Sequence, residues 1–188
     1  MTRSLKTLLM ALLTAASALS AHAQTVRLQT TVGDIDIELH ADKAPATVAN
    51  FMAYVRSGFF SEIIFHRVID GFMIQTGGYK ANLSEKPTRP PIALESGNGL
   101  NNVRGSVAMA RTSDPNSATS QFFINVADNA FLDKENARDG RGYAVFGTVV
   151  EGMETVDRIK ALPTSAKGVF QNLPQSTVTI VKATVIKP

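Results

Sequence analysis

Cysteine and tryptophan are absent from the 188-residue sequence, and histidine occurs only three times. Without cysteine the chain has no disulfide, no thiol nucleophile and no thiolate metal site, so its stability must come from packing. The few histidines and the dispersed acids form no pattern of metal ligands, and no serine lies in a nucleophile-elbow motif. We therefore expect no metal and no cofactor, and hydrolysis has little support.

A strong charge of one sign is also missing. The sequence has 19 Lys and Arg against 16 Asp and Glu, a formal net charge of +3. Two of the basic residues, Arg3 and Lys6, belong to the extreme N-terminus, and without them the two signs nearly balance. This balance gives no indication of nucleic-acid binding.

The chain has one long apolar run, and it lies at the N-terminus. Even when extended from Leu8 to Leu19, the run is shorter than the roughly 20 residues that a membrane span needs. The small residues at 21–23 follow it, and the whole is typical of a secretory signal peptide cleaved before Gln24, with a retained anchor as the alternative. We expect residues 24–188 to form one soluble, monomeric domain without a membrane span, in the periplasm, or else secreted from the cell.

Alternating residues predict a β-hairpin at the start of this domain. Val26 and Leu28 belong to the first strand, and apolar and acidic residues alternate over residues 34–39 of the second. A turn at residues 32–34 separates the two strands. The alternation has a period of two, which predicts one buried and one exposed face.

Two segments predict helices. The first begins near Pro45, which suits a first helical turn, and ends before Gly58. The second covers residues 153–162, and Pro163 limits its extension. Apolar residues recur at helical spacing in the first, at Val48, Phe51, Met52 and Val55, and in the second, at Met153, Val156 and Ile159.

The remaining apolar segments predict strands. A second hairpin is expected from residues 63–69 and 72–75, and the proline-rich segment 80–91 predicts a surface loop. In the last strand the apolar set changes parity between Ile180 and Val181, which indicates either a bulge or burial of both faces. Many short strands with few helices predict a mainly β fold, a closed antiparallel barrel of eight strands with two covering helices. The other expected strands are residues 103–111, 121–126, 143–150 and 177–186.

Several short motifs together carry a family resemblance. The sequence FHRVIDGFMIQTGG at residues 65–78, with SQFFI at 120–124 and VFG at 145–147, closely resembles the cyclophilins. Further matches lie at residues 98–100, 104–105 and 109–111, in the order and spacing of that family. The resemblance covers nearly all of the mature chain. It implies a peptidyl-prolyl cis-trans isomerase of the exported bacterial branch.

The reaction of that family places physical demands on the site. The cis and trans forms of an Xaa-Pro bond are close in energy but are separated by a barrier of roughly 18–20 kcal/mol. Bringing the step to the millisecond range needs about five powers of ten, or roughly 7 kcal/mol. Because no bond breaks, orientation and electrostatics can supply this without a nucleophile.

Arg67 is the residue at the family's catalytic arginine position. In the twisted transition state the proline nitrogen gains a free lone pair, which a guanidinium can engage. The alternative is a surface arginine in an ion pair. Gln75 is expected to hold the substrate backbone and to steady Arg67, since a carboxamide both donates and accepts. This requires a three-residue loop ending at Phe72, which pairs Arg67 with Gln75, because a two-residue turn at Asp70 and Gly71 puts them out of register.

The resemblance also implies an apolar slot for the proline ring. The matching positions are Phe72, Met73, Phe123 and Leu132, and Phe72 is grouped with Arg67 and Gln75 at the catalytic centre. These apolar residues also suit an ordinary core. We assign Phe122 to the core because neighbours on a strand point to opposite faces.

Other predicted contacts depend on weaker signals. Gln121, Ala110 and Arg111 match the family's contacts to the residues before proline. Phe131 and Tyr143 stand where tryptophan and histidine are common, and they complete the expected substrate-binding set. Since Phe131 removes an indole donor, we expect weakened binding of the inhibitor cyclosporin. Asp70 and Arg111 also differ from the usual proline and asparagine, which affects loop rigidity and substrate preference.

His66 is expected to face away from Arg67 and to have a structural role, with catalysis as the alternative. The predicted function is to accelerate Xaa-Pro isomerisation in proline-containing, unfolded or partly folded exported polypeptides. A non-catalytic proline-peptide-binding module, or holdase, that uses the same groove is the alternative function.

Overall fold

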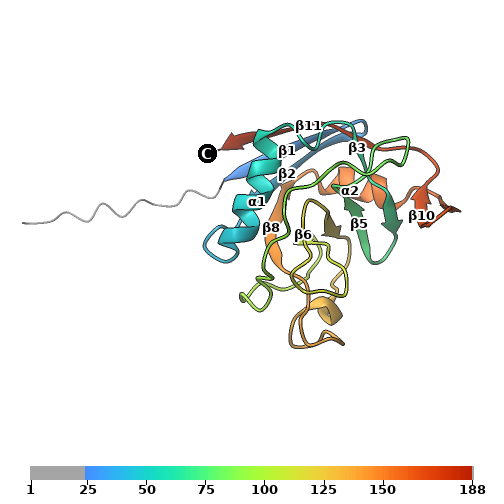
Figure 1. Cartoon of the computed structure of the whole chain (residues 1–188). Helices are drawn as coiled ribbons and strands as arrows, with labels where there is room; N and C mark the ends of the chain where they lie inside the picture. The colour runs from blue at the N-terminus through green and yellow to red at the C-terminus, as the bar shows by residue number, and fades with distance from the viewer. Residues whose placement is uncertain (1–23, 188) are drawn as a thin grey trace, which may run out of the picture.

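The computed structural model describes residues 24–187 as a strongly curved antiparallel sheet with two α-helices and a small second sheet (Figure 1). The predicted signal peptide, residues 1–23, lies outside the described residues. The main sheet consists of β1 (Thr25–Thr30), β2 (Gly33–Leu39), β3 (Ile63–Ile64), β4 (Arg67–Ile69), β5 (Met73–Thr76), β6 (Ser106–Met109), β7 (Phe122–Asn125), β8 (Val145–Glu151) and β11 (Thr179–Lys187). The helices are α1 (Pro45–Arg56) and α2 (Met153–Lys160), and the small sheet pairs β9 (Thr164–Lys167) with β10 (Phe170–Pro174).

The nine strands of the main sheet follow the order β3-β11-β1-β2-β8-β6-β7-β5-β4. Only Phe65 and His66 separate β3 from β4, so these two strands are parts of one interrupted segment. The N–H of Ile64 donates to the carbonyl of Tyr79 at 2.9 Å, which joins β3 to the chain following β5. This hydrogen bond connects the two ends of the strand order, and the mainly β fold predicted from the sequence is confirmed.

Both predicted helices are confirmed. Helix α1 starts with Pro45 in its first turn, and Gly58 follows its end with a φ of 68°. Helix α2 is two residues shorter than predicted, ending at Lys160. Figure 1 shows the two helices apart from each other, and α1 contacts β11 whereas α2 contacts β2, β4 and β5. Among residues 24–187, no helix has the length and apolar character needed to cross a membrane.

The register of the β4–β5 hairpin is the one that the site requires. Arg67 pairs with Gln75, and Ile69 pairs with Met73. The three residues 70–72 form the loop, and Gly71 adopts a φ of 73°, a left-handed conformation that glycine accepts without strain. The predicted three-residue loop is confirmed.

The parity change in the last strand is a bulge. Thr30 pairs with Ile180 and Gln29 pairs with Lys182, so Val181 is the additional residue on β11. Ile180 is fully buried, while Val181 is 58% exposed. Burial of both faces, the alternative interpretation, is therefore wrong.

Three features differ from the sequence prediction. The main sheet has nine strands instead of eight, because β3 and β4 are interrupted. Strand β6 covers Ser106–Met109 only, because the chain before it turns with Gly105 at a φ of 86°. The β9–β10 hairpin and a short 3-10 helix at Ala130–Leu132 were not predicted.

Two groups of buried side chains fill the fold. The larger group contains the rings of Phe51, Phe60, Phe122 and Phe146, and Phe51 lies 5.1–5.3 Å from each of the other three by ring centroids. Phe122 is completely buried there, as predicted. The smaller group consists of Met73, Ala108, Phe123, Leu132 and Val145, and it forms the floor of the site described next.

Candidate active site

A cavity of about 100 Å³ opens on the sheet where β4, β5 and β7 meet. Its wall is completed by the end of β6 and by the segment from the 3-10 helix to Tyr143. The cavity gathers nine of the predicted site residues, which are Arg67, Phe72, Met73, Gln75, Ala110, Arg111, Phe123, Leu132 and Tyr143. Residues that are far apart in the sequence thus form one small cavity.

Arg67 lies at the polar side of this cavity with its guanidinium unpaired by any carboxylate. Within residues 24–187 it makes no ion pair, so the ion-pair alternative is wrong. Its Nη1 donates to Oε1 of Gln75 at 3.4 Å, and its Cζ lies 5.9 Å from the centroid of the Phe72 ring. Burial lowers the pKa of Arg67, yet a guanidinium remains protonated in proteins.

Gln75 connects Arg67 to a neighbouring strand. While its oxygen accepts from Arg67, its Nε2 donates to Oε1 of Gln121 at 2.9 Å. The carboxamide therefore has one orientation in which both bonds exist. Gln121 does not line the central cavity, but borders a second cavity of about 280 Å³ that also contains Gln75, Ala110 and Arg111.

The floor of the central cavity is apolar. Met73, Phe123 and Leu132 are buried, and Phe72 is half-buried at the rim. The ring of Tyr143 lies 5.8 Å from that of Phe123 in an edge-on arrangement. A donor at the rim of an apolar floor suits a flat apolar ring with a polar nitrogen at its edge.

Asn129 fixes the rim and was not recognised in the sequence. Its Nδ2 donates to the carbonyl of Phe72 at 2.8 Å and to Oδ1 of Asn125 at 2.7 Å. The Asn102 N–H and Nδ2 both donate to Oδ1 of Asp133, at 2.7 and 2.9 Å. These buried amides join the β4–β5 loop to the segment that carries Leu132. A cluster of asparagines near turns was the one sequence signal available.

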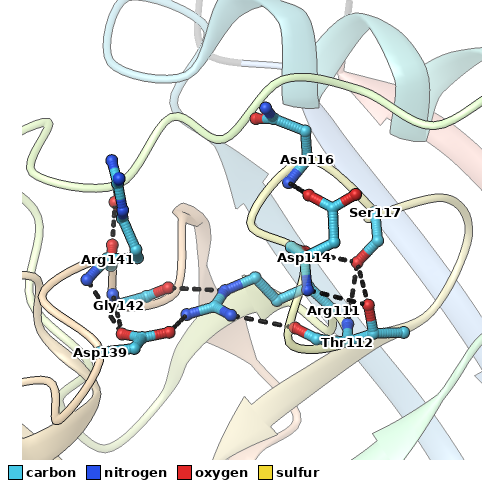
Figure 2. A network of polar contacts seen from close by, with 9 residues as sticks. Arg111, Thr112, Asp114, Asn116, Ser117, Asp139, Arg141 and Gly142 are labelled. Atoms are coloured by element: carbon cyan, nitrogen blue, oxygen red, sulfur yellow. Dashed lines mark hydrogen bonds and ion pairs between the residues drawn. The ribbon is translucent and has the colours of Figure 1, made fainter.

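Arg111 is held rigidly by the loop opposite (Figure 2). Its side chain is only 3% exposed, and it donates to the carbonyls of Gly142 and Thr112 at 2.9 and 3.0 Å. Nη2 pairs with Asp139 at 2.5 Å, and the guanidinium lies 4.5 Å from the centroid of the Tyr143 ring. The Arg141 N–H and Arg111 lower the pKa of Asp139 to about 2. Arg111 thus lines the cavity, and the hydrogen bonds that it donates stabilise the cavity wall.

Phe131 and His66 lie outside the central cavity. Phe131 is 57% exposed and packs against Phe72, with ring centroids 5.5 Å apart. His66 is 5% exposed, and burial lowers its pKa to about 4, so its imidazole is neutral near pH 7. Its ring packs edge-on against Tyr79 at 4.8 Å, which favours the structural role. Within the described part of the chain, no group of three or more His, Asp or Glu is placed to hold a metal ion.

The antiparallel sheet presents an arginine, a glutamine and an apolar floor in one small cavity, an arrangement that suits the binding of an apolar ring beside a hydrogen-bond donor. Residues 25–185 match the family model described as cyclophilin type peptidyl-prolyl cis-trans isomerase/CLD. The chain belongs to this family, and its chemistry is that of the isomerase class.

Relatives and solved structures agree with this assignment. The chain is 52% identical to a peptidyl-prolyl cis-trans isomerase of Acinetobacter baylyi over 89% of each chain. It is 51% identical to peptidyl-prolyl cis-trans isomerase B of Escherichia coli, covering 85% of this chain and 98% of the relative. A cyclophilin-type isomerase of Cryptosporidium parvum has a TM-score of 0.74 and 26% identity, covering 89% of this chain and 99% of the other.

Proposed function

We propose that this chain accelerates Xaa-Pro isomerisation in exported polypeptides, in the periplasm and as a monomer, after removal of residues 1–23. The observation that carries the proposal is the guanidinium of Arg67 at the rim of an apolar cavity, where no carboxylate of residues 24–187 pairs with it. A related cyclophilin-type isomerase of Cryptosporidium parvum has been crystallised in the presence of the dipeptide Ala-Pro. A proline residue is a suitable occupant of a cavity with such a floor.

The mechanism is electrostatic. The floor of Met73, Phe123 and Leu132 takes the proline ring, which leaves the imide bond at the rim near Arg67. As the bond twists, amide resonance is lost and the nitrogen lone pair becomes available to a donor. Arg67 donates to that lone pair more strongly in the twisted state than in either planar state, which lowers the barrier. No covalent intermediate forms.

Gln75 and its neighbours position the reacting groups. The hydrogen bond from Arg67 to Gln75 limits the movement of the guanidinium, and the bond from Gln75 to Gln121 limits the movement of the amide. The residues before proline are expected to follow Ala110, Arg111 and Gln121, which border the second cavity. That cavity continues directly from the first because both contain Gln75, Ala110 and Arg111.

The test compares purified mature protein with Arg67→Ala in a protease-coupled assay on an Xaa-Pro peptide. Arg67→Ala is expected to lower kcat/KM by about two orders of magnitude, the size of a lost transition-state donor. Arg56→Ala, an exposed arginine at the end of α1, is the matched control and keeps full activity. An unchanged rate in Arg67→Ala overturns the mechanism. Binding of proline peptides without acceleration by the wild-type protein indicates the binding-module alternative.

Export is tested separately. After expression of the full chain in a bacterium with an outer membrane, the mature protein is expected in the periplasmic fraction with Gln24 at its N-terminus. A protein that keeps residues 1–23 and sediments with membranes indicates a retained anchor.

A further inference from the structure

The β9–β10 hairpin forms one wall of a third cavity, about 440 Å³, beside the catalytic centre. The hairpin supplies its tip, residues 169–172, and Val169 is the most exposed large apolar side chain in the described chain, at 86%. The opposite wall comes from the catalytic strands and their neighbours. The residues that line this cavity outside the hairpin tip are His66, Arg67, Gln75, Tyr79 and Gln121.

The hairpin is anchored by aromatic contacts. Phe170 packs edge-on against Tyr79 with ring centroids 4.9 Å apart, and it lies 6.2 Å from the ring of His66. The N–H of Gln175 also donates to the carbonyl of Pro163 at 2.9 Å, which closes the base of the hairpin. The exposed Val169 is therefore presented at a defined place by a fixed support.

The third cavity is continuous with the catalytic cavity through Arg67 and Gln75, which line both. The second cavity meets the catalytic cavity through Gln75, Ala110 and Arg111, and the last two do not line the third. The catalytic cavity therefore shares Arg67 with the third cavity only, and Ala110 and Arg111 with the second only, while the two outer cavities meet each other at Gln75 and Gln121. A polypeptide with its proline in the central cavity and its preceding residues along Ala110 and Arg111 continues toward the hairpin.

We infer that this cavity is a subsite for the substrate residues that follow proline, with Val169, Gln171 and Asn172 as its specificity-determining residues. The inference rests on the proposed isomerase function. The carboxamides of Gln171 and Asn172 can both donate to and accept from a polypeptide backbone, while Val169 offers an apolar contact. Arg67 is the only charged residue in the lining, so the subsite disfavours Lys and Arg, and the exposed Val169 favours an apolar side chain.

The experiment uses two peptides with the same Ala-Pro core. The short peptide ends in an amide directly after the residue that follows proline, and the long one continues with three residues that include leucine. NMR exchange measurements give kcat/KM for each peptide with the mature protein. The long peptide is expected to be isomerised about tenfold more efficiently, the ratio expected from one buried apolar contact and its backbone bonds.

Val169→Ser is expected to reduce that long-to-short ratio toward one, and Gln171→Ala to reduce it partly. Val150→Ser is the matched control, because Val150 is also an exposed valine and lines none of these cavities. A further control peptide is extended before proline and not after it. The ratio of its kcat/KM to that of the short peptide is expected to be the same in Val169→Ser and in the wild-type protein. An unchanged long-to-short ratio in Val169→Ser overturns the subsite.

The same peptides separate this failure from a failure of the proposed function. If the wild-type protein accelerates neither peptide, the isomerase function is wrong, and the ratio of the two Kd values, measured by titration calorimetry, then decides the subsite. Tighter binding of the long peptide that is lost in Val169→Ser supports the subsite even then. Equal Kd values overturn it.

Discussion

Gln75 lies directly opposite Arg67 in the β4–β5 hairpin and uses both ends of its carboxamide, accepting from Arg67 at 3.4 Å and donating to Gln121 at 2.9 Å. The orientation of the catalytic guanidinium therefore depends, through one amide, on Gln121, the residue just before strand β7. Removal of the Gln75 amide therefore changes the orientation of the Arg67 guanidinium but does not remove the guanidinium.

The first prediction concerns this amide. Gln75→Ala is expected to lower kcat/KM about tenfold, since one hydrogen bond to a charged group contributes roughly 1.5 kcal/mol. The larger part of the change should fall on kcat, because Arg67 loses its orientation in the transition state. Gln29→Ala, an exposed glutamine of β1, serves as control. A tenfold increase in KM with an unchanged kcat would show that Gln75 only binds substrate.

The second prediction concerns two glycines near the site. Gly71 and Gly77 both have positive φ, 73° and 95°, but a Cβ at Gly71 meets nothing within 4 Å. A Cβ at Gly77 overlaps the carbonyl of Ser120 and lies 2.9 Å from Cα of Gln121. Gly71→Ala is expected to cost about 1–2 kcal/mol of unfolding free energy, and Gly77→Ala about 1–3 kcal/mol more, measured by urea denaturation. If both variants lose the same unfolding free energy, the backbone at Ser120 and Gln121 moves away from the added Cβ without a cost.

The third prediction concerns the pair of Arg111 and Asp139. Because the Arg141 N–H and Arg111 together lower the pKa of Asp139 to about 2, the ionised carboxylate contributes stability that is complete above the ordinary pKa near 4 and is lost as the pH falls through about 2. Asp139→Asn is expected to lower the Tm at pH 7 and to raise KM, because Arg111 loses its anionic partner. At pH 2 the Tm difference between the variant and the wild type should narrow. Asp42→Asn, an exposed aspartate in the turn before α1, is the control.

The fourth prediction concerns acid stability. Burial lowers the pKa of His66 to about 4 from an ordinary 6.5, so the unfolded chain takes up the proton first as the pH falls. Stability is therefore lost between about pH 6.5 and pH 4, by roughly 3 kcal/mol at pH 4. The unfolding free energy of His66→Gln should fall less over that interval. Parallel pH profiles of the two proteins would contradict this.

The fifth prediction concerns cyclosporin. Phe131 has no indole donor, and we expect weak inhibition of the wild-type protein. Phe131→Trp is expected to strengthen inhibition about tenfold, the effect of one added hydrogen bond with its apolar contact, while kcat/KM for peptides changes little. Phe131→Leu is the control for ring size. If inhibition of Phe131→Trp equals that of the wild type, the indole is not the missing group.

The sequence predicted the register of the β4–β5 hairpin because this register follows from loop length. A three-residue loop at residues 70–72 leaves one register for the hairpin, and this register places Arg67 beside Gln75. The parity change between Ile180 and Val181 likewise indicated an irregularity in the last strand, and the structure shows which of the two alternatives it is. These features are local, so a pattern of a few residues determines them.

The sequence did not predict the β9–β10 hairpin or the buried asparagines. Strand β9 has the sequence TSAK, mostly exposed and without apolar alternation, so no period-two pattern exists. The hairpin depends instead on Phe170 packing against Tyr79, a residue of a distant segment. The bond from Asn129 to the carbonyl of Phe72 joins residues 57 positions apart. Contacts of this kind appear only after the chain has folded.

The pairing of β1 with β11 has a consequence for how the protein is made. Thr25 of the first strand pairs with Lys187 of the last, and β1 lies between β2 and β11 in the middle of the sheet order. Until the final strand has left the ribosome, one edge of β1 has no partner, and the hairpin of β1 and β2 is only marginally stable alone. The pairing of β1 is complete only when the whole polypeptide is present, so formation of the full sheet is a late event in the synthesis of the chain.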